Sequence, residues 1–435
     1  MRPGIWRGAV GIVTMLIALG AMLTGTGAAV ASPRAAPTTG QCTAETRLAA
    51  TPPALDQLQS TSAWTVTRGA GVVVAVVDSG VAANNPHLAG AIAGGIDLVG
   101  DGMGQGGYAD LDGHGTAIAG EIAARRIGGS GVLGLAPDAR ILSVRVFSST
   151  GDQAKRAGTG PSIARLAEGI RAAAAARAQI INVSLSTDSD DPELRAAVAY
   201  ATAAGSLVVA SAGNSNGDYA VGANGANGVN GVNGVRYPAN DPGALGVTAV
   251  NTAGQATSAS IHGPHIVVAA PGQNVLTSSS LGGDCVYASD APATSFSTGY
   301  AAAAAALVAG AYPNEKPAQW IYRLEASAVR PSAGARDNQL GWGIVQPYDA
   351  LTFIPGAGVP GPIDPDGKEG AVPARTTQGV SPLQHQVLPE AAARQIAGLA
   401  GLTAAILVSG IAVIGLYLRR IRAVQPGPRL SRATE

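Results

Sequence analysis

The sequence predicts an α/β domain in which helices cover both faces of a mostly parallel sheet, and three observations support this prediction. Segments with strand and helix patterns alternate along the chain, as they do in βαβ units. Residues 72–77 are all apolar and lack the alternation of a half-buried strand, which is typical of a strand covered on both faces. The chain of 435 residues is 46% hydrophobic and only 13% charged, so it can fill a large core.

The predicted elements lie between residues 55 and 351. The first is an amphipathic helix over residues 55–68, with Trp64 as its apolar anchor. Further elements are expected, in chain order, at strand 72–77, helix 117–124, strand 140–147, helix 162–178, strand 179–185, helix 192–204, strand 207–210, strands 246–250 and 266–269, and a helix that starts near Ser295. Residues 94–107 are expected to form a Gly-rich loop, and residues 215–235, with their Asn-Gly repeat, a flexible surface insertion beside the candidate site described below.

Residues 1–31 have the layout of a secretory signal peptide. Two arginines precede a short apolar run, and Ala29-Val30-Ala31 is a small-residue cleavage site, so we expect cleavage after Ala31. An uncleaved anchor is the alternative. Export to an oxidising compartment favours a disulfide between the only two cysteines, Cys42 and Cys285, with two separate thiols as the alternative.

The rest of the chain divides into an N-terminal extension (residues 32–54), the main domain (55–354) and a linker rich in Pro and Gly (355–394). Residues 395–418 are apolar and long enough to span a bilayer. The basic tail of residues 419–435 then places the C-terminus in the cytoplasm and the main domain outside it. The sequence therefore predicts a single-pass protein of the cell membrane. A soluble core helix at 395–418 is excluded by the length of the run and the arginines that follow it.

The charge balance excludes some classes of partner. The chain has 28 basic and 28 acidic side chains, so its net charge is zero and nothing indicates nucleic-acid binding. No cofactor is implied, and no loop is rich enough in ligands to predict a metal site.

Four polar residues stand where catalytic groups are found in α/β enzymes. Asp78 and Asn214 follow buried strands, His114 lies between two glycines at the start of a helix, and Ser295 precedes an Ala-rich run. Each has a simpler structural reading alone, as a turn residue or a helix cap. Together they supply a nucleophile (Ser295), a base (His114) whose flanking glycines would leave substrate access, an orienting carboxylate (Asp78) and an oxyanion donor (Asn214).

The segments around these residues resemble the four sequence blocks of subtilisin-like serine proteases. The blocks are Val77-Asp78-Ser79-Gly80-Val81, Asp112-Gly113-His114-Gly115-Thr116, Ala212-Gly213-Asn214 and Thr294-Ser295. They occur in the order Asp, His, Ser that subtilisin has, and the resemblance covers about residues 55–351. It implies the subtilisin-like three-layer α/β/α fold and a serine endopeptidase acting on polypeptides. By the same resemblance, Ser184-Leu185-Ser186 would be the edge along which a substrate peptide pairs as an added strand.

The order of segments outside the domain resembles the mycosins, the membrane-anchored subtilases associated with type VII secretion. This resemblance implies a membrane complex of that secretion system as a partner, and it leaves open a second role as a structural subunit in which proteolysis is secondary. A purely degradative protease is disfavoured by the anchor. Three residues depart from the family pattern: Ala293 and Ser186 stand in place of Gly, and Gly299 stands in place of Pro. We expect Ala293 to crowd a turn, Gly299 to loosen the start of the serine helix and Ser186 to narrow the groove.

Overall fold

The computed structural model describes residues 42–103, 105–221, 234–332, 334–356, 359–366, 413–416 and 418. The chain divides into two compact units, residues 1–371 and 372–435, and the helices and strands named below lie in the first. The predicted signal peptide lies outside the described residues, as do most of the linker and nearly all of the predicted membrane span. Among the described residues, no helix has the length and apolar character needed to cross a bilayer.

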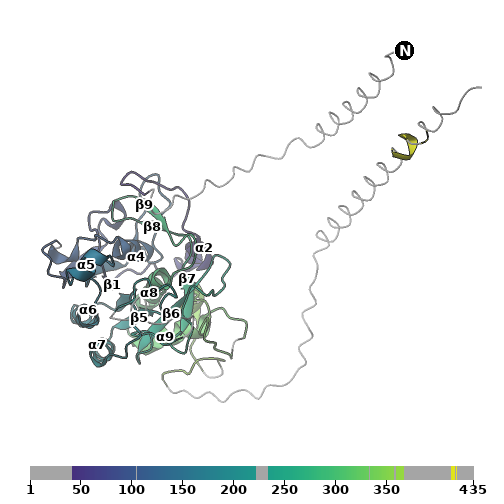
Figure 1. Cartoon of the computed structure of the whole chain (residues 1–435). Coiled ribbons are helices and arrows are strands. Elements are labelled where there is room, and N and C mark those ends of the chain that lie inside the picture. The colour runs from purple at the N-terminus through teal and green to yellow at the C-terminus, as the bar shows by residue number, and fades with distance from the viewer. Residues whose placement is uncertain are drawn as a thin grey trace, which may run out of the picture. The chain divides into compact units, whose positions relative to one another are not determined.

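A seven-stranded sheet forms the centre of the first unit, in the order β2-β3-β1-β4-β5-β6-β7. Figure 1 labels β1, β5, β6 and β7 of this sheet. All of its neighbouring strands pair in parallel. The strands are β1 (Val73–Asp78), β2 (Ile92–Asp97), β3 (Arg140–Arg145), β4 (Ile180–Val183), β5 (Leu207–Ser211), β6 (Ala244–Val250) and β7 (Val268–Pro271). Because the strands are parallel, the residues that follow β1 and β5 meet at the same edge of the sheet.

Helices cover both faces of this sheet (Figure 1). One face carries α6 (Ile163–Ala175) and α7 (Pro192–Ala203), and the other carries α4 (His114–Ala123) and α8 (Thr294–Ala311), with α9 (Pro317–Ser327) and α10 (Pro347–Thr352) beyond α8. Side chains of β1 alternate between the two hydrophobic clusters, Val74 and Val76 toward α8 and Ala75 and Val77 toward α6. This confirms the predicted α/β fold with a mostly parallel sheet.

Helix α8 is the buried centre of its layer. Residues 301–306 are all alanine and all have zero exposure, which lets the helix lie close to the sheet and to α4. Alanine also has the highest intrinsic helix propensity, so the segment forms a regular helix although it has almost no polar face. The helix therefore gives a rigid position to the residues of its first turn, which include Ser295.

Several expectations from the sequence were wrong or incomplete. The helix expected at 55–68 is two short helices, α2 (Pro53–Gln57) and α3 (Ser60–Ala63), separated by Gln59 with a left-handed φ of 49°. The loop expected at 94–107 begins with the end of β2 and contains the short helix η3 (Gln105–Gly107). Among the described residues, the sequence also did not predict β2, η2 (Pro86–Leu88), α5 (Asp152–Arg156), α9, α10 and the antiparallel hairpin of β8 (Val275–Ser278) and β9 (Asp284–Tyr287).

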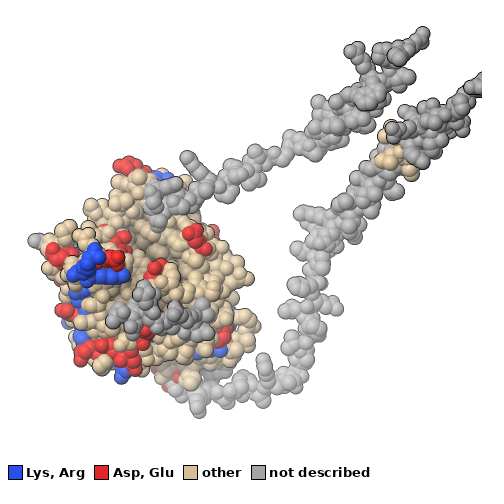
Figure 2. Space-filling view, in the orientation of Figure 1, with Lys and Arg blue, Asp and Glu red and all other residues tan. Residues whose placement is uncertain are grey.

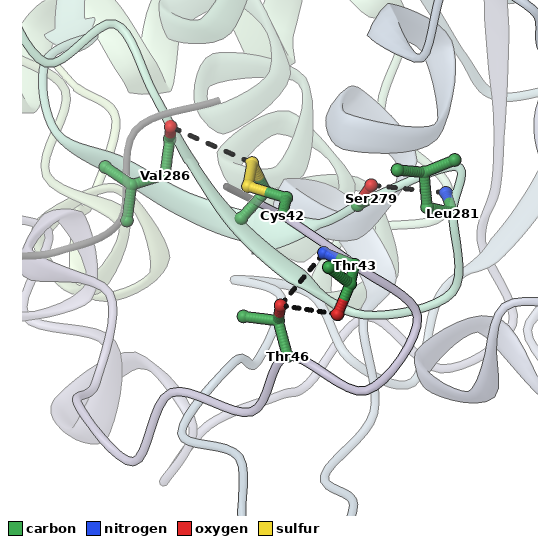
Figure 3. The surroundings of a disulfide bond; sticks show 7 residues. Cys42, Thr43, Thr46, Ser279, Leu281 and Val286 are labelled. Carbon is green, nitrogen blue, oxygen red and sulfur yellow. Dashed lines mark hydrogen bonds between the residues drawn. A yellow bond between two sulfur atoms is a disulfide. The ribbon is translucent and has the colours of Figure 1, made fainter. Parts of the chain in front are cut away.

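A disulfide joins Cys42 to Cys285 of β9, with their Cα atoms 5.4 Å apart (Figure 3). The segment after Cys42 is held by Asp284: its carboxylate accepts from the Leu48 N–H at 2.7 Å, and its own N–H donates to the Thr46 carbonyl at 2.9 Å. The other carboxylate oxygen lies 2.8 Å from His87 Nε2, and this pair is fully buried. The N-terminal arm is thus fixed to the hairpin by one covalent bond and several hydrogen bonds.

The visible surface carries charges of both signs in small, interspersed groups, and most of it is uncharged (Figure 2). This distribution matches the equal numbers of basic and acidic residues in the sequence.

Candidate active site

The structure brings Asp78 and His114 into direct contact. Asp78 ends β1 and His114 begins α4, and the His114 Nδ1–H donates to Asp78 Oδ1 at 2.8 Å. Both side chains are buried, and the Ser79 N–H donates to the same carboxylate oxygen at 2.8 Å. The carboxylate therefore fixes both the tautomer and the orientation of the imidazole, leaving Nε2 as the nitrogen that can accept a proton.

The turn before α4 is shaped by Asp110, a residue that the sequence pattern did not indicate. Its carboxylate accepts from the Gly113 N–H, from the N–H and hydroxyl of Thr116, and from the Ser79 hydroxyl. Gly113 has a left-handed φ of 89°, and a Cβ on Gly115 would lie 2.1 Å from the Gly80 carbonyl oxygen. The backbone thus requires both glycines beside His114, a structural reason that stands next to the substrate access expected of them.

The charges around His114 favour its protonated form. Burial by itself lowers the pKa of His114, but the hydrogen bond and negative charge of Asp78, with the carboxylates of the turn, outweigh it. The pKa of His114 therefore lies above its ordinary value. Such an imidazole is a stronger base, and its imidazolium is stabilised once it has taken a proton.

Ser295 lies in the first turn of α8, and its hydroxyl is buried. Neither Ser295 Oγ nor His114 Nε2 has a hydrogen-bond partner among the described residues. The Ser295 carbonyl accepts from the Ser184 hydroxyl at 2.7 Å, which ties α8 to the end of β4. Ser295 and Asn214 together line a cavity of about 550 Å³.

Asn214 follows β5 and is oriented by the start of α8. Its Oδ1 accepts from the N–H and the hydroxyl of Thr294, at 2.8 and 2.9 Å. Because its oxygen is held in this way, the amide N–H₂ group faces the other direction and donates to the Asp218 carbonyl over a long 3.5 Å. At this distance the hydrogen bond is weak, so an oxyanion near Ser295 can compete for the amide donor.

The expected substrate edge at Ser184-Leu185-Ser186 is not free in the structure. Leu185 is buried, and the hydroxyl of Ser184 is used by α8. The Ser186 N–H donates to the Tyr219 carbonyl at 3.2 Å, and the Ser186 carbonyl accepts from the Val221 N–H at 2.8 Å. Residues 219–221 thus pack against the site, as expected of an insertion beside it, although Val221 is buried and not at the surface.

The structure shows the surroundings of the three residues that depart from the family pattern. Ala293 has φ −121° and ψ 132°, an ordinary extended conformation, so its methyl group strains no turn. Gly299 lies within α8 rather than at its start, and a Cβ there would lie 2.0 Å from Oε2 of Glu121 on α4. The missing Cβ makes room for a buried carboxyl group. Ser186 directs its hydroxyl at Gly213, 3.0 Å from where a Cβ of that glycine would lie.

Glu121, in the helix expected at 117–124, was assigned no role of its own from the sequence. Its side chain is buried beside α8, and neither carboxyl oxygen has a hydrogen-bond partner among the described residues. Burial, and then the negative charge of Asp78, raise the pKa of Glu121 well above its ordinary value. A hydrophobic pattern cannot reveal such a residue, because a glutamate in a helix is normally assigned to the solvent face.

In the part of the chain that the structure describes, no group of three or more His, Cys, Asp or Glu side chains is arranged to bind a metal ion. The site consists of a carboxylate, an imidazole, a hydroxyl and an amide, which are the groups of nucleophilic acyl transfer.

Comparison with known proteins agrees with this chemistry. The profile of the subtilase family matches residues 69–343. Mycosin-1 of Mycolicibacterium smegmatis is 35% identical over 69% of this chain and 73% of its own length, and Mycosin-3 of Mycobacterium tuberculosis is 34% identical over 81% and 82%. The crystal structure of MycP1 from Mycobacterium smegmatis has a TM-score of 0.61 at 32% identity, covering 77% of this chain and 90% of MycP1. The structure of the MycP3 protease from the type VII (ESX-3) secretion system has a TM-score of 0.60 at 30% identity, covering 74% and 98%.

Proposed function

Since this chain belongs to the subtilase family of serine proteases and, within that family, to the mycosins, we propose that it is a membrane-anchored endopeptidase with an Asp78–His114–Ser295 triad. The observation that carries the proposal is the buried 2.8 Å hydrogen bond between Asp78 and His114, in a domain that holds Ser295 at the start of a rigid helix. Charge, geometry and burial are those of an oriented general base.

In the proposed reaction, Ser295 Oγ attacks the carbonyl carbon of the scissile peptide bond while His114 Nε2 takes its proton. Asp78 keeps the imidazole in its tautomer and stabilises the imidazolium. His114 then returns the proton to the leaving amine, and water hydrolyses the acyl-enzyme by the same steps in reverse. The side-chain amide of Asn214 and the N–H of Ser295 hold the oxyanion. Removing one such donor from subtilisin lowers turnover by about 10²- to 10³-fold.

We place this activity at the outer face of the cell membrane, in a type VII secretion system. One similar solved protein, MycP1, is described as an essential component of the type VII (ESX-1) secretion system. In this chain the signal peptide of residues 1–31 would direct export, and the apolar residues 395–418 would anchor the peptidase domain. The basic tail after residue 418 would remain in the cytoplasm.

A structural role in the secretion complex is the second candidate function. It is favoured by the occupied edge at Ser186, because a protein whose substrate edge is paired with its own chain can contribute through its body alone. In that case the membrane complex requires the folded domain, and catalysis is secondary.

Covalent labelling tests the first function. A fluorophosphonate probe should label the intact protein and fail to label Ser295→Ala, whose helix should be unchanged because Ala is a good helix former. Absence of labelling in a correctly folded wild type would exclude the triad. Complementation of a deletion strain with Ser295→Ala separates the two functions: restored secretion supports the structural role, and lost secretion supports proteolysis.

A further inference from the structure

The segment Asp218-Tyr219-Ala220-Val221 contacts three parts of the site at once, and we call these residues the strap. Its first contact is with the substrate edge. The Ser186 N–H donates to the Tyr219 carbonyl and the Val221 N–H donates to the Ser186 carbonyl, so Ala220 and Ser186 form a parallel β-bridge. An extended peptide added to this edge would use the same N–H and carbonyl group.

The second contact covers the catalytic histidine. The Tyr219 ring stacks on the His114 imidazole, with 3.7 Å between ring centroids and 22° between planes. The phenol hydroxyl donates to Asp112 Oδ1 at 3.1 Å, in the turn that leads into α4. Phe296 lies 5.4 Å from the imidazole centroid at a tilt of 53°. The tyrosine ring therefore fills the space over one face of the base, where part of a bound substrate would lie.

The third contact is with the oxyanion amide. Asn214 donates to the carbonyl of Asp218, the first residue of the strap, over 3.5 Å. The strap thus contacts the substrate edge, the base and the oxyanion donor, while Ser295 Oγ and His114 Nε2 bond to none of the residues that the structure describes.

The strap is not in a relaxed backbone conformation. Tyr219 has a φ of 59°, in the left-handed region that side chains with a Cβ rarely occupy. Leaving this position would relieve the strain. The strap is held over the Ser186 edge and the imidazole by two backbone hydrogen bonds, the phenol hydrogen bond and the ring stack, so a substrate that replaces these contacts can compete with it.

We propose that residues 218–221 inhibit the free enzyme by occupying the Ser186 edge and the space over His114, and that an extended peptide must displace them before it can react. This inference rests on the proposed protease function. If the strap served only to steady the imidazole with its tyrosine ring, its backbone would not need to pair with Ser186, so this pairing distinguishes inhibition from positioning. The two roles also predict effects of opposite sign when the ring is removed.

The experiment compares the rate at which a peptidyl phosphonate with three alanines before the reactive group labels Ser295 in variants of the full chain. Tyr219→Ala should be labelled about tenfold faster than wild type, because it loses the stack and the phenol hydrogen bond. Tyr219→Phe keeps the stack and should be labelled roughly two- to threefold faster. Tyr200→Ala, which removes an exposed tyrosine of α7, should be labelled at the wild-type rate.

If Tyr219→Ala is labelled no faster than wild type, the strap does not inhibit the enzyme, and the proposed protease function is unaffected. No labelling in any variant would overturn both. If Tyr219→Ala does not fold, hydrogen exchange on wild type decides: attachment of the peptidyl phosphonate should speed exchange at the Val221 amide. Unchanged or slower exchange there would show that the strap stays in place when the groove is filled.

Discussion

Glu121 should make the stability of the domain depend on pH, and replacing it should remove that dependence. Glu121 is 1% exposed, its carboxyl group has no hydrogen-bond partner among the described residues, and burial raises its pKa well above the value of an unfolded chain. A group with a raised pKa binds more protons in the folded state. Its contribution to the stability of the folded protein is therefore greatest below the unfolded pKa of about 4.3, and that contribution is lost as pH rises through the folded pKa.

The magnitude follows from linkage. Between the two pKa values, this group lowers the free energy of unfolding by about 1.4 kcal/mol for each unit of pH. Glu121→Gln keeps the shape and cannot ionise, so the difference in unfolding free energy between the variant and wild type should grow with that slope. At neutral pH the variant should be more stable.

Urea unfolding monitored by circular dichroism measures this slope between about pH 5 and about pH 8, a range that lies above the unfolded pKa of about 4.3. Glu168→Gln is the matched control, since Glu168 is an exposed glutamate of α6 and its replacement should leave the curve unchanged. Parallel curves for wild type and Glu121→Gln would mean that Glu121 titrates alike in the folded and unfolded states, which a buried carboxyl group without a partner cannot do.

The same contacts lead to three more predictions. Gly299→Ala should lower the free energy of unfolding by about 1–3 kcal/mol in wild type and by much less in a Glu121→Ala background. A double-mutant cycle measures this, and additive effects would show that residue 299 does not contact Glu121. Burial favours the neutral form of Asp284, but hydrogen bonds led by that from His87 lower its pKa, so its stabilisation is present above about pH 4 and lost as pH falls through the folded pKa. Asp284→Asn should therefore lower the free energy of unfolding by about 3 kcal/mol at neutral pH and by little in acid. Thermal melts in which the loss of stability is the same at both pH values would disprove this. The raised pKa of His114 should place the midpoint of the acid limb of the kcat/KM profile above about pH 6.5. A midpoint below that pH would show that burial lowers the pKa of His114 by more than Asp78 raises it.

The sequence predicted the parts of the fold in which local pattern and tertiary role agree. Strand β1 is apolar on both faces because both faces are covered, and the residues that end β1 and follow β5 reach one edge because the strands are parallel. Strand β2 was missed because it contains Gly94 and Gly95. A Cβ at Gly95 would lie 1.7 Å from the Gly106 carbonyl, so tertiary crowding selects a residue that local propensity disfavours.

The candidate site was predictable where a motif marks it and not where distant residues complement each other. Asp78 and His114 were found from their sequence blocks, and their contact agrees with the role assigned to them. Glu121 and Gly299 explain each other only once α4 and α8 are seen side by side. The sequence placed a loop beside the site, but the composition of the Asn-Gly repeat gave no sign that Tyr219, just before it, stacks on His114.

The proposed chemistry depends on Ser295 being a nucleophile that His114 activates, and this can be checked by locating the covalent adduct. After reaction with a fluorophosphonate, peptide mass spectrometry should find the probe on Ser295 in wild type and find almost none in His114→Ala. An adduct on another serine, or equal labelling of Ser295 without the imidazole, would show that these two residues do not act as proposed.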